Sequence, residues 1–327
     1  MVSMDQSQVI RDYLKEELLT FEDCLRRSIE SANPRISDVV KYIFATNGKQ
    51  LRPMLVFLTA KSCGEVTPAT YHGAVTVELL HTASLVHDDV IDESKFRRNK
   101  PSTNAIFDNT RSVLVGDYLL SSALLQSVET KDIEIVKIMS ELGRNLAEGE
   151  LNQYALANEI IIDEKAYFEV IEKKTASLLR ACCTIGAMTA GANKDTVSKF
   201  RKLGELLGIS FQIRDDIFDY FKADVGKPTG NDIREGKITL PLIYALQHAS
   251  REASDEIMQL IQSRQYSQEN IQKILDFAIE NKGIDYAFDV MTKYLTEAEG
   301  IVSDLNIDDD KKMLFQFFLL YLKERKY

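Results

Sequence analysis

Two clusters of aspartates stand out because their spacing could bind a divalent cation. The first reads DDVID and the second DDIFD; their acids are Asp88, Asp89, Asp92, Asp215, Asp216 and Asp219. In a helix, the outer aspartates of each cluster are four residues apart and share one face, while the middle aspartate points roughly 100° away. Two carboxylates this close repel each other unless a cation intervenes. Each cluster therefore predicts a pair of carboxylates with a cation between them.

The chemistry of these ligands favours magnesium. Hard oxygen ligands without His or Cys suit Mg²⁺ better than zinc, and Mg²⁺ held by one or two carboxylates keeps positions open for substrate phosphate. A single cluster is as typical of an acidic helix end in solvent as it is of a metal site. Two copies, each ending an apolar helix-like run and each followed by basic residues, favour a metal site. The predicted metal ligands are Asp88, Asp92, Asp215 and Asp219.

Basic residues accompany both clusters. They are Lys49 and Arg52 in GKQLRP, Arg97 and Arg98 after the first cluster, Lys174 beside Thr175, and Lys227 and Lys237 after the second cluster. Arginine forks match phosphate oxygens, and lysines supply point charges. Any one of them alone is more typical of a solvated surface. Together with the paired aspartates they predict a site for one or more diphosphates.

Two histidines lie near the first cluster. A lone helical histidine is usually a packed core residue, but His81 falls on the same helical face as Ser84 and Asp88, which favours a place in the site. His87 adjoins Asp88 but points off that face. We expect His87 to support the site residues and not to bind the metal itself.

The elements that position these residues are predicted to be helices. Gly and Pro number only 15 and 6 in 327 residues, and between them apolar residues recur every three or four positions. Thr67 followed by Pro68 predicts the start of a helix that runs to Asp92. The other predicted helices are 5–31, 35–46, 51–62, 110–128, 131–157, 163–190, 194–221, 238–249, 252–264, 267–281, 283–303 and 308–325. Without a linker or a break in composition, the chain is predicted to be one all-α domain, residues 1–327, built as a large helix bundle.

The overall composition narrows the class of protein. Apolar residues make up 45% and charged residues 28%, which is typical of a folded globular protein. The net charge of −10 argues against binding nucleic acid. The cysteines Cys24, Cys63, Cys182 and Cys183 form no CxxC pair, so we expect reduced thiols. The sequence shows neither a signal-peptide pattern nor an apolar run long enough for a transmembrane helix, and the protein is predicted to be cytoplasmic.

The sequence resembles the trans-polyprenyl diphosphate synthases, and most of all their long-chain, octaprenyl-type members. The matching segments are GKQLRP, ELLHTASLVHDDVIDESKFRR, GDYLLS, AEGELNQ, EKKTASL, GISFQIRDDIFDYF and GKPTGNDIREGKITLP, in this order over residues 48–241. The resemblance implies the isoprenoid (terpenoid) synthase fold, a single helix bundle around a central hydrophobic cavity. It also implies Mg²⁺-dependent, sequential condensation of isopentenyl diphosphate onto an allylic diphosphate such as farnesyl diphosphate. One departure is Asn99, where the family usually has glycine; we expect it to alter a turn and not the chemistry.

The resemblance also implies roles for single residues. Asp88, Asp89 and Asp92, with Asp215 and Asp219, would hold Mg²⁺ against the allylic diphosphate, and Asp216, Lys174 and Lys227 would join them as catalytic residues. Arg97, Lys174, Thr175, Gln212, Lys227 and Lys237 would support the allylic diphosphate. Lys49, Arg52, His81 and Arg98 would bind isopentenyl diphosphate. The released pyrophosphate would accept the proton lost in the reaction.

Other functions fit the sequence less well. An HD-type metal phosphohydrolase, also all-α, could use His87 and Asp88 with His72 or His81, but it leaves DDIFD and the basic residues unexplained. A terpene cyclase usually pairs the first cluster with a second motif that contains Asn and Ser. A regulatory subunit of a two-component synthase would be expected to lack one or both clusters. A short-chain farnesyl or geranylgeranyl diphosphate synthase is the main alternative within the resembled family.

The residues before Asp88 bear on product length. At 1.5 Å rise per residue, Ser84 lies about 6 Å below Asp88, with Ala83 beside it. A large aromatic residue at this depth limits the product in short-chain members of the resembled family, whereas Ser84 and Ala83 leave the path open, as do Val77 and Ala74. We therefore predict a long all-trans product, of the kind used for quinone side chains. We also predict a homodimer, because the helix at 110–128 is apolar around much of its circumference. The protein is predicted to contact membranes only through its product.

Overall fold

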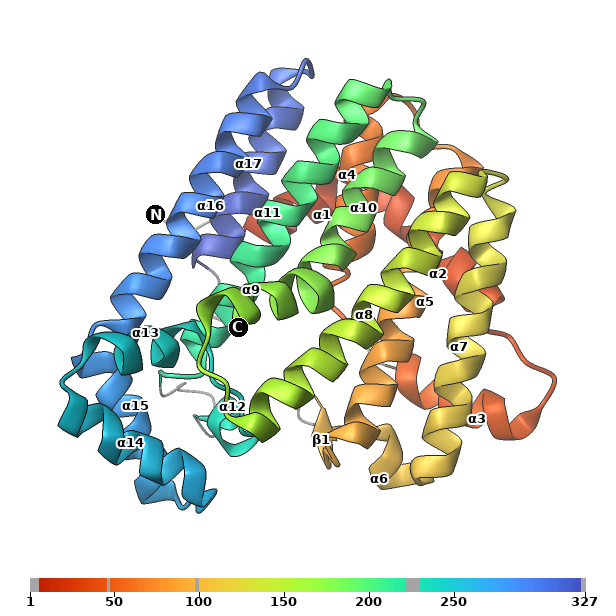
Figure 1. Ribbon diagram of the computed structural model, residues 1–327. Coiled ribbons are helices and arrows are strands. Elements are labelled where there is room, and N and C mark those ends of the chain that lie inside the picture. Colours follow the sequence, from red (N-terminus) through yellow and green to blue (C-terminus); the bar gives the residue numbers. More distant parts are fainter. Residues whose placement is uncertain (1–5, 46–47, 98–99, 222–229, 325–327) are drawn as a thin grey trace. The chain divides into compact units, whose positions relative to one another are not determined.

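The computed structural model describes residues 6–45, 48–97, 100–221 and 230–324, and these residues are almost entirely helical (Figure 1). The elements are α1 (Gln6–Tyr13), α2 (Lys15–Ser28), α3 (Pro34–Phe44), α4 (Leu51–Cys63), α5 (Pro68–Ile91), β1 (Phe96–Arg97), β2 (Lys100–Pro101), α6 (Thr103–Phe107), α7 (Asn109–Glu129), α8 (Ile133–Glu159), α9 (Glu164–Ile171), the π-helical turn η1 (Glu172–Ala176), α10 (Ser177–Thr189), α11 (Lys194–Phe218), α12 (Asn231–Arg234), α13 (Leu240–His248), α14 (Arg251–Ser263), α15 (Gln268–Glu280), α16 (Gly283–Asp304) and α17 (Asp309–Glu324). The predicted all-α class is confirmed. The sequence did not predict β1, β2, α6, α12 or the π-turn.

The chain divides into two compact units. Unit 1 contains residues 1–144, 178–204 and 302–318, and unit 2 contains residues 145–177, 205–301 and 319–327. The division falls within several helices, α8, α11, α16 and α17 among them. The first aspartate cluster belongs to unit 1 and the second to unit 2. That the chain forms one functional domain stays a prediction.

In unit 1, α5 is the helix that positions the first cluster. It begins where the sequence predicts: the Thr67 side chain accepts from the Thr70 backbone N–H, the Thr70 hydroxyl accepts from the Thr67 N–H, and Pro68 follows at the first helical position. The helix packs along α7 over much of its length, with α4 and α2 on its other sides (Figure 1). Buried apolar residues such as Val75, Leu79 and Leu80 hold it in the core. The aspartates therefore project from the end of a firmly packed helix.

In unit 2, the π-turn lies where two glycines permit close packing of backbone on backbone. A Cβ atom at Gly149 of α8 would lie 2.9 Å from the backbone nitrogen of Lys174. A Cβ atom at Gly208 of α11 would lie 2.4 Å from the Cα of Ala176. A side chain at either position would collide with the turn. The two helices can therefore approach it this closely only because both positions are glycine. The turn is thus tightly held between α8 and α11 of this unit, and it carries Lys174 and Thr175.

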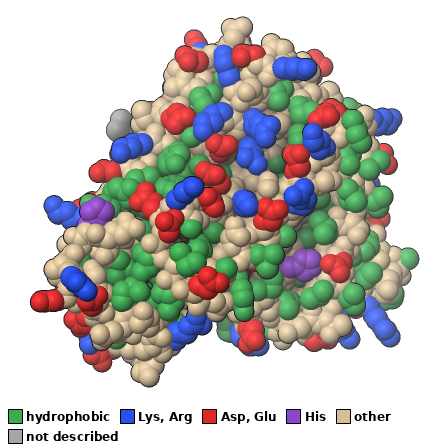
Figure 2. Space-filling view, in the orientation of Figure 1, with side chains coloured by type: hydrophobic (Ala, Val, Ile, Leu, Met, Phe, Trp, Pro, Cys, Tyr) green, Lys and Arg blue, Asp and Glu red, His purple; other side chains and the backbone are tan. Residues whose placement is uncertain are grey.

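Three general features concern membrane crossing, the cysteines and the distribution of surface charge. Among the described residues, no helix combines the length and the apolar character that crossing a membrane requires. The four cysteines are free thiols, and burial raises the pKa of Cys63 to about 11 and that of Cys183 to about 12. Acidic and basic side chains are interspersed over the face shown in Figure 2, so the negative net charge is not gathered into one patch there.

Candidate active site

The middle aspartate of the first cluster is an interior residue. Asp89 is only 2% exposed, and its Oδ1 accepts a hydrogen bond of 2.6 Å from the Nε of Arg97 on β1. Its backbone carbonyl accepts from the side-chain amide of Asn104 on α6 at 3.1 Å. Burial raises the pKa of Asp89, and the Arg97 guanidinium opposes that shift. Asp89 therefore anchors the β1–β2 hairpin to α5. The other two aspartates of the cluster are more accessible: Asp88 is half-buried, and Asp92, which ends the helix, is exposed.

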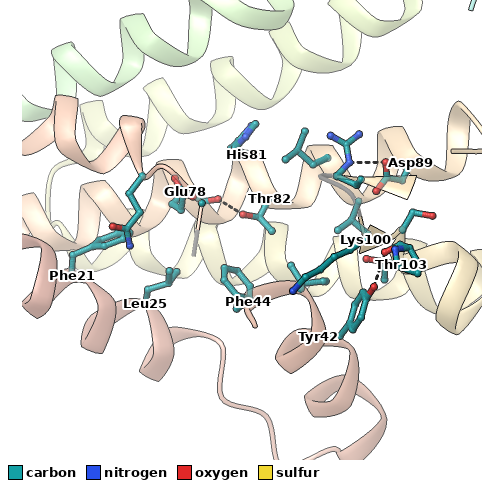
Figure 3. Close-up of a pocket in the computed structure, with 18 residues that line it drawn as sticks. Phe21, Leu25, Tyr42, Phe44, Glu78, His81, Thr82, Asp89, Lys100 and Thr103 are labelled. Atoms are coloured by element: carbon teal, nitrogen blue, oxygen red, sulfur yellow. Dashed lines mark hydrogen bonds and ion pairs between the residues drawn. The ribbon is translucent and has the colours of Figure 1, made fainter. Parts of the chain in front are cut away.

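A cavity in unit 1, here called pocket A, opens along α5 beside this ion pair (Figure 3). The α5 side chains in its wall are Glu78, His81, Thr82, Leu85, Val86 and Asp89. The hairpin contributes Arg97 and Lys100, and α2 and α3 contribute aromatic and aliphatic side chains such as Phe21 and Phe44. The Tyr42 hydroxyl donates to the Pro101 carbonyl at 2.6 Å, which ties the hairpin to α3. Pocket A thus combines cationic groups at one end with an apolar wall.

Pocket A lies on a different face of α5 from Asp88. Its α5 residues are centred near Asp89, about 90° around the helix from the face that bears Ser84 and Asp88. His81 lies at the edge between the two faces and lines the pocket. Ala83 is 2% exposed, and the Ser84 hydroxyl donates to the His81 carbonyl at 2.9 Å. Neither residue is part of the wall of pocket A, so their predicted role in product length stays a prediction.

The loop before α4 contributes Gly48 and Gln50, and not its cations, to pocket A. Gly48 and Gln50 line the cavity, and Gln50 has a left-handed backbone with φ of 52° that starts α4. Lys49 is exposed, with its carbonyl bound by Arg11, and Arg52 is half-buried on the first turn of α4. Neither of these cations is in the wall of the pocket. Arg98, Asn99 and Lys227 lie outside the described residues.

The middle aspartate of the second cluster is also interior. Asp216 on α11 is 3% exposed, and its Oδ2 accepts from the Tyr167 hydroxyl of α9 at 2.5 Å. Its Oδ1 accepts from the side-chain amide of Gln212 at 2.7 Å, and the carbonyl oxygen of that amide accepts from the Thr175 hydroxyl at 2.6 Å. Burial raises the pKa of Asp216 to about 6, and the hydrogen bonds from Tyr167 and Gln212 oppose the shift. Asp215 is half-buried.

Asp219 fixes the chain that follows the second cluster. Its two carboxylate oxygens accept from the backbone N–H groups of Asn231 and Asp232, at 3.0 and 2.9 Å. Burial raises the pKa of Asp219, and these two hydrogen bonds oppose the shift. Burial, together with the negative charges of Asp216 and Asp219, raises the pKa of Asp232 well above its usual value. Asp219 thus has a structural role in holding α12, in addition to its predicted role as a metal ligand.

A second cavity, pocket B, lies within unit 2. Polar side chains in its wall are Gln153, Asp163, Tyr167, Lys174, Thr175, Gln212, Asp216, Asp232, Lys237 and Thr239, and apolar ones include Leu156, Ile171 and Ile243. Lys174 pairs with Glu150 of α8, and its Nζ is 3.4 Å from Oε1 of Gln153. Lys237 pairs with Glu235. Four predicted site residues, Lys174, Thr175, Gln212 and Lys237, therefore meet around one cavity together with Asp216.

Several residues of this site were not predicted from the sequence. Glu150 and Gln153 are three apart in AEGELNQ, a spacing that places them on one helical face, and this was the available indication. Asp232 lies in the matching segment GKPTGNDIREGKITLP. No sequence pattern pointed to Tyr167, because it lies 49 residues from its partner Asp216.

His87 lines neither pocket, and its expected supporting role stays a prediction. Its Nε2 is 3.3 Å from the Val113 carbonyl and 3.4 Å from Oδ1 of Asp117, both on α7. Gly116 leaves room for this imidazole, because a Cβ atom there would lie 2.2 Å from Nε2. His72 is likewise bound to α7, at 2.7 Å from Oε1 of Gln126.

The carboxylates present are suited to a hard divalent cation, although no single cluster completes a site. Among residues 6–45, 48–97, 100–221 and 230–324, no three His, Cys, Asp or Glu side chains are arranged to hold a metal ion. Each cluster offers oxygen ligands only, which is the donor chemistry that Mg²⁺ and Ca²⁺ prefer. Oxygen atoms of a bound diphosphate would have to supply further ligands. The residues therefore fit a metal that binds together with its substrate.

Comparison with known proteins gives concordant results. The sequence profile of the polyprenyl synthetase family matches residues 33–278. The octaprenyl diphosphate synthase of Haemophilus influenzae is 33% identical over 309 residues, which cover 94% of this chain and 92% of that enzyme. The solved structure of a geranylgeranyl pyrophosphate synthase from Bacteroides thetaiotaomicron is 38% identical, with a TM-score of 0.85 over 98% of this chain and 100% of that one. The structure of a polyprenyl synthase from Caulobacter crescentus, complexed with calcium and isoprenyl diphosphate, is 28% identical, with a TM-score of 0.91 over 98% of both chains.

Proposed function

The chain belongs to the polyprenyl synthetase family and is a prenyltransferase, and from that premise we propose that it adds isopentenyl diphosphate repeatedly to an allylic diphosphate, giving a long all-trans chain. The allylic substrate is farnesyl diphosphate or a similar compound, and the product serves quinone side chains. The observation that carries the proposal is pocket B, where Lys174, Thr175, Gln212 and Lys237 line one cavity together with Asp216 of the second aspartate cluster.

The reaction needs charge stabilisation more than a protein nucleophile. The bond between the allylic carbon and the diphosphate oxygen breaks, which leaves an allylic cation and pyrophosphate. The double bond of isopentenyl diphosphate attacks the cation, a carbon–carbon bond forms, and a proton passes to the released pyrophosphate. Asp88 and Asp92 of the first cluster, and Asp215 and Asp219 of the second, would each hold Mg²⁺, which would supply positive charge that stabilises the departing diphosphate.

In this proposal each pocket binds a different substrate. In pocket B, Lys174 and Lys237 attract the allylic diphosphate, and the hydroxyl of Thr175 and the amide of Gln212 orient it. In pocket A, His81 and the cations of the hairpin bind isopentenyl diphosphate against the apolar wall, and Lys49 and Arg52 lie next in sequence to the lining residues Gly48 and Gln50. Arg97, which the resemblance assigned to the allylic substrate, lines pocket A. Its pairing with Asp89 keeps the guanidinium in place.

The decisive experiment is a product assay. Purified protein is incubated with radiolabelled isopentenyl diphosphate, farnesyl diphosphate and MgCl₂, and the dephosphorylated products are separated by chromatography. We expect labelled all-trans products longer than geranylgeranyl, and none when EDTA replaces MgCl₂. Absence of any labelled elongation product in the presence of Mg²⁺ would refute the proposed activity.

The same assay addresses the short-chain alternative. The similarity to the geranylgeranyl pyrophosphate synthase from Bacteroides thetaiotaomicron supports that alternative, because its identity of 38% exceeds that of the octaprenyl enzyme. The small side chains at Ala83 and Ser84 support the long-chain product instead. Accumulation of geranylgeranyl diphosphate as the final product would decide for the short-chain enzyme.

The proposal includes a homodimer formed through α7. This helix exposes an apolar stripe whose members, Leu114, Leu125 and Val128, are 61%, 67% and 55% exposed and share one helical face. Figure 2 shows hydrophobic side chains along the edge where Figure 1 places α7. Contact with membranes through the product, and the cytoplasmic location, stay predictions. The match to the polyprenyl synthetase family leaves the HD-type alternative without support.

A further inference from the structure

We propose that Tyr167 is a positioning residue that fixes the second aspartate cluster and, through it, the groups that receive the allylic diphosphate. The inference rests on the proposed function and assigns a role to a residue that contacts neither aspartate predicted to bind metal. Its basis is a hydrogen-bonded chain that runs from Tyr167 through Asp216 and Gln212 to Thr175.

Asp216 has both carboxylate oxygens engaged by this chain. The Tyr167 hydroxyl holds Oδ2 at 2.5 Å, and the Gln212 amide holds Oδ1 at 2.7 Å. A buried carboxylate needs such donors, because removal from water strongly disfavours a charge that no hydrogen bond compensates. The pair of bonds therefore sets the rotation of the carboxylate and, in turn, the orientation of the Gln212 amide.

The orientation of Gln212 determines what Thr175 can offer. The Gln212 NH₂ group donates to Asp216, so its carbonyl oxygen faces Thr175 and accepts the hydroxyl proton at 2.6 Å. If the Gln212 amide were flipped, its NH₂ group would face Thr175. The Thr175 hydroxyl would then have to accept that hydrogen bond and could no longer donate to Gln212. Tyr167 thus influences the hydroxyl of Thr175 across three hydrogen bonds.

Two points of attachment join the segment α9–η1 to α11. Tyr167, which precedes the π-turn, donates to Asp216, and Thr175, which lies within the turn, donates to Gln212. Asp216 and Gln212 are one helical turn apart on α11. A phenylalanine at position 167 would fill the core equally well, since the ring packs edge-on against Phe168 with centroids 5.3 Å apart. The hydroxyl is therefore explained by its bond to Asp216 and not by packing.

Tyr167→Phe removes the hydroxyl alone, and Tyr286→Phe is a matched control. The Tyr286 hydroxyl also donates to a carboxylate of unit 2, Oε1 of Glu164 at 2.8 Å, but Tyr286 is not in the wall of pocket B. Binding of inorganic pyrophosphate in MgCl₂ is measured by calorimetry, which requires no turnover. We expect Tyr167→Phe to weaken binding about 10-fold, below the limit of about 100-fold set by the loss of one hydrogen bond to a charged group, because that bond joins Tyr167 to Asp216 and not to the ligand. Tyr286→Phe should bind like wild type.

Steady-state kinetics separate positioning from a general loss of structure. Tyr167→Phe should raise the KM for the allylic diphosphate by a similar factor and leave the KM for isopentenyl diphosphate within about twofold, since only pocket B changes. Partial unfolding would lower the concentration of active enzyme without altering either KM. Wild-type pyrophosphate binding by Tyr167→Phe, an equal loss in Tyr286→Phe, or an equal rise in both KM values would overturn the inference. If the wild type itself makes no elongated product, the proposed function fails first and the inference fails with it.

Discussion

At the scale of single residues, the two aspartate clusters share an asymmetry. In each, the middle carboxylate is nearly inaccessible to solvent and is held by donors from other elements: Arg97 for Asp89, and Tyr167 with Gln212 for Asp216. Asp88 and Asp215 are only half-buried, and each is four residues from a further aspartate. This arrangement favours Asp88 and Asp215 as direct metal ligands, with the middle residues as the scaffold that keeps the cluster in place.

The first prediction concerns the metal ligands. Asp88→Ala and Asp215→Ala should each lower kcat by about 100-fold or more, because charge stabilisation through the metal contributes several kcal/mol to the transition state. Asp195→Ala, which removes an exposed carboxylate paired with Lys199 on α11, is the control and should retain activity. The measurement is initial rate at saturating substrates, with EDTA and readdition of MgCl₂. Near wild-type rates in either variant would exclude the assignment.

Asp219 gives a second prediction, in stability. Asp219→Ala removes the acceptor for two backbone N–H groups and should lower the free energy of unfolding by about 1–3 kcal/mol. The measurement is urea unfolding in buffer without metal, with exposed Asp289→Ala as control. An unchanged unfolding midpoint would mean that these hydrogen bonds contribute nothing and that Asp219 acts through metal alone.

Ser84 gives a third prediction, in product length. Ser84→Phe places an aromatic ring about one turn below Asp88 and should shorten the product to farnesyl or geranylgeranyl diphosphate, with the metal dependence unchanged. Chromatography of the products gives the length distribution. Thr82→Val, which changes the wall of pocket A and not the face of α5 below Asp88, is the control and should leave product length unchanged. If product length is the same in Ser84→Phe and wild type, the argument from depth is wrong although the enzyme class could still hold.

At the scale of elements, the π-turn Glu172–Ala176 is the feature that places Lys174 and Thr175. It interrupts a long helical stretch, and π-turns of this kind are frequent at functional sites. Gly149 and Gly208 allow α8 and α11 to touch its backbone directly. Local residue preferences therefore matter less here than the packing of three segments.

The fourth prediction follows from that packing. Gly208→Ala should destabilise the protein and lower activity, because its Cβ atom would lie 2.4 Å from the Cα of Ala176. Gly300→Ala, on α16, has no atom within 4 Å of the new Cβ and should be neutral or stabilise by up to about 1 kcal/mol. Thermal unfolding of the two variants makes the comparison. A melting temperature for Gly208→Ala equal to that of Gly300→Ala would contradict the described packing.

At the scale of the whole molecule, the exposed stripe on α7 bears on assembly. Leu114, Leu125 and Val128 expose apolar surface on a helix whose opposite side packs along α5. The fifth prediction is that Leu125→Glu weakens self-association at least 10-fold, because a charge would have to lose its hydration in the interface. Sedimentation over a range of concentrations measures it, with Leu19→Glu on α2, a residue 57% exposed, as control. A wild-type chain that sediments as a monomer of 37.1 kDa at micromolar concentration would contradict the homodimer.

The sequence by itself determined the helical class, the approximate ends of most helices and both aspartate clusters. These features depend on residues close together in the chain: apolar spacing, Thr67 before Pro68, and acids four positions apart. Helix α6, helix α12 and the β1–β2 hairpin were missed because segments of two to five residues are too short to show a periodicity. Only the tertiary structure decided that Asp89 and Asp216 are buried, that His87 packs against α7, and that Tyr167 reaches Asp216. The physical reason is that burial and hydrogen-bond partners depend on elements far apart in sequence, and local composition does not specify which of them meet.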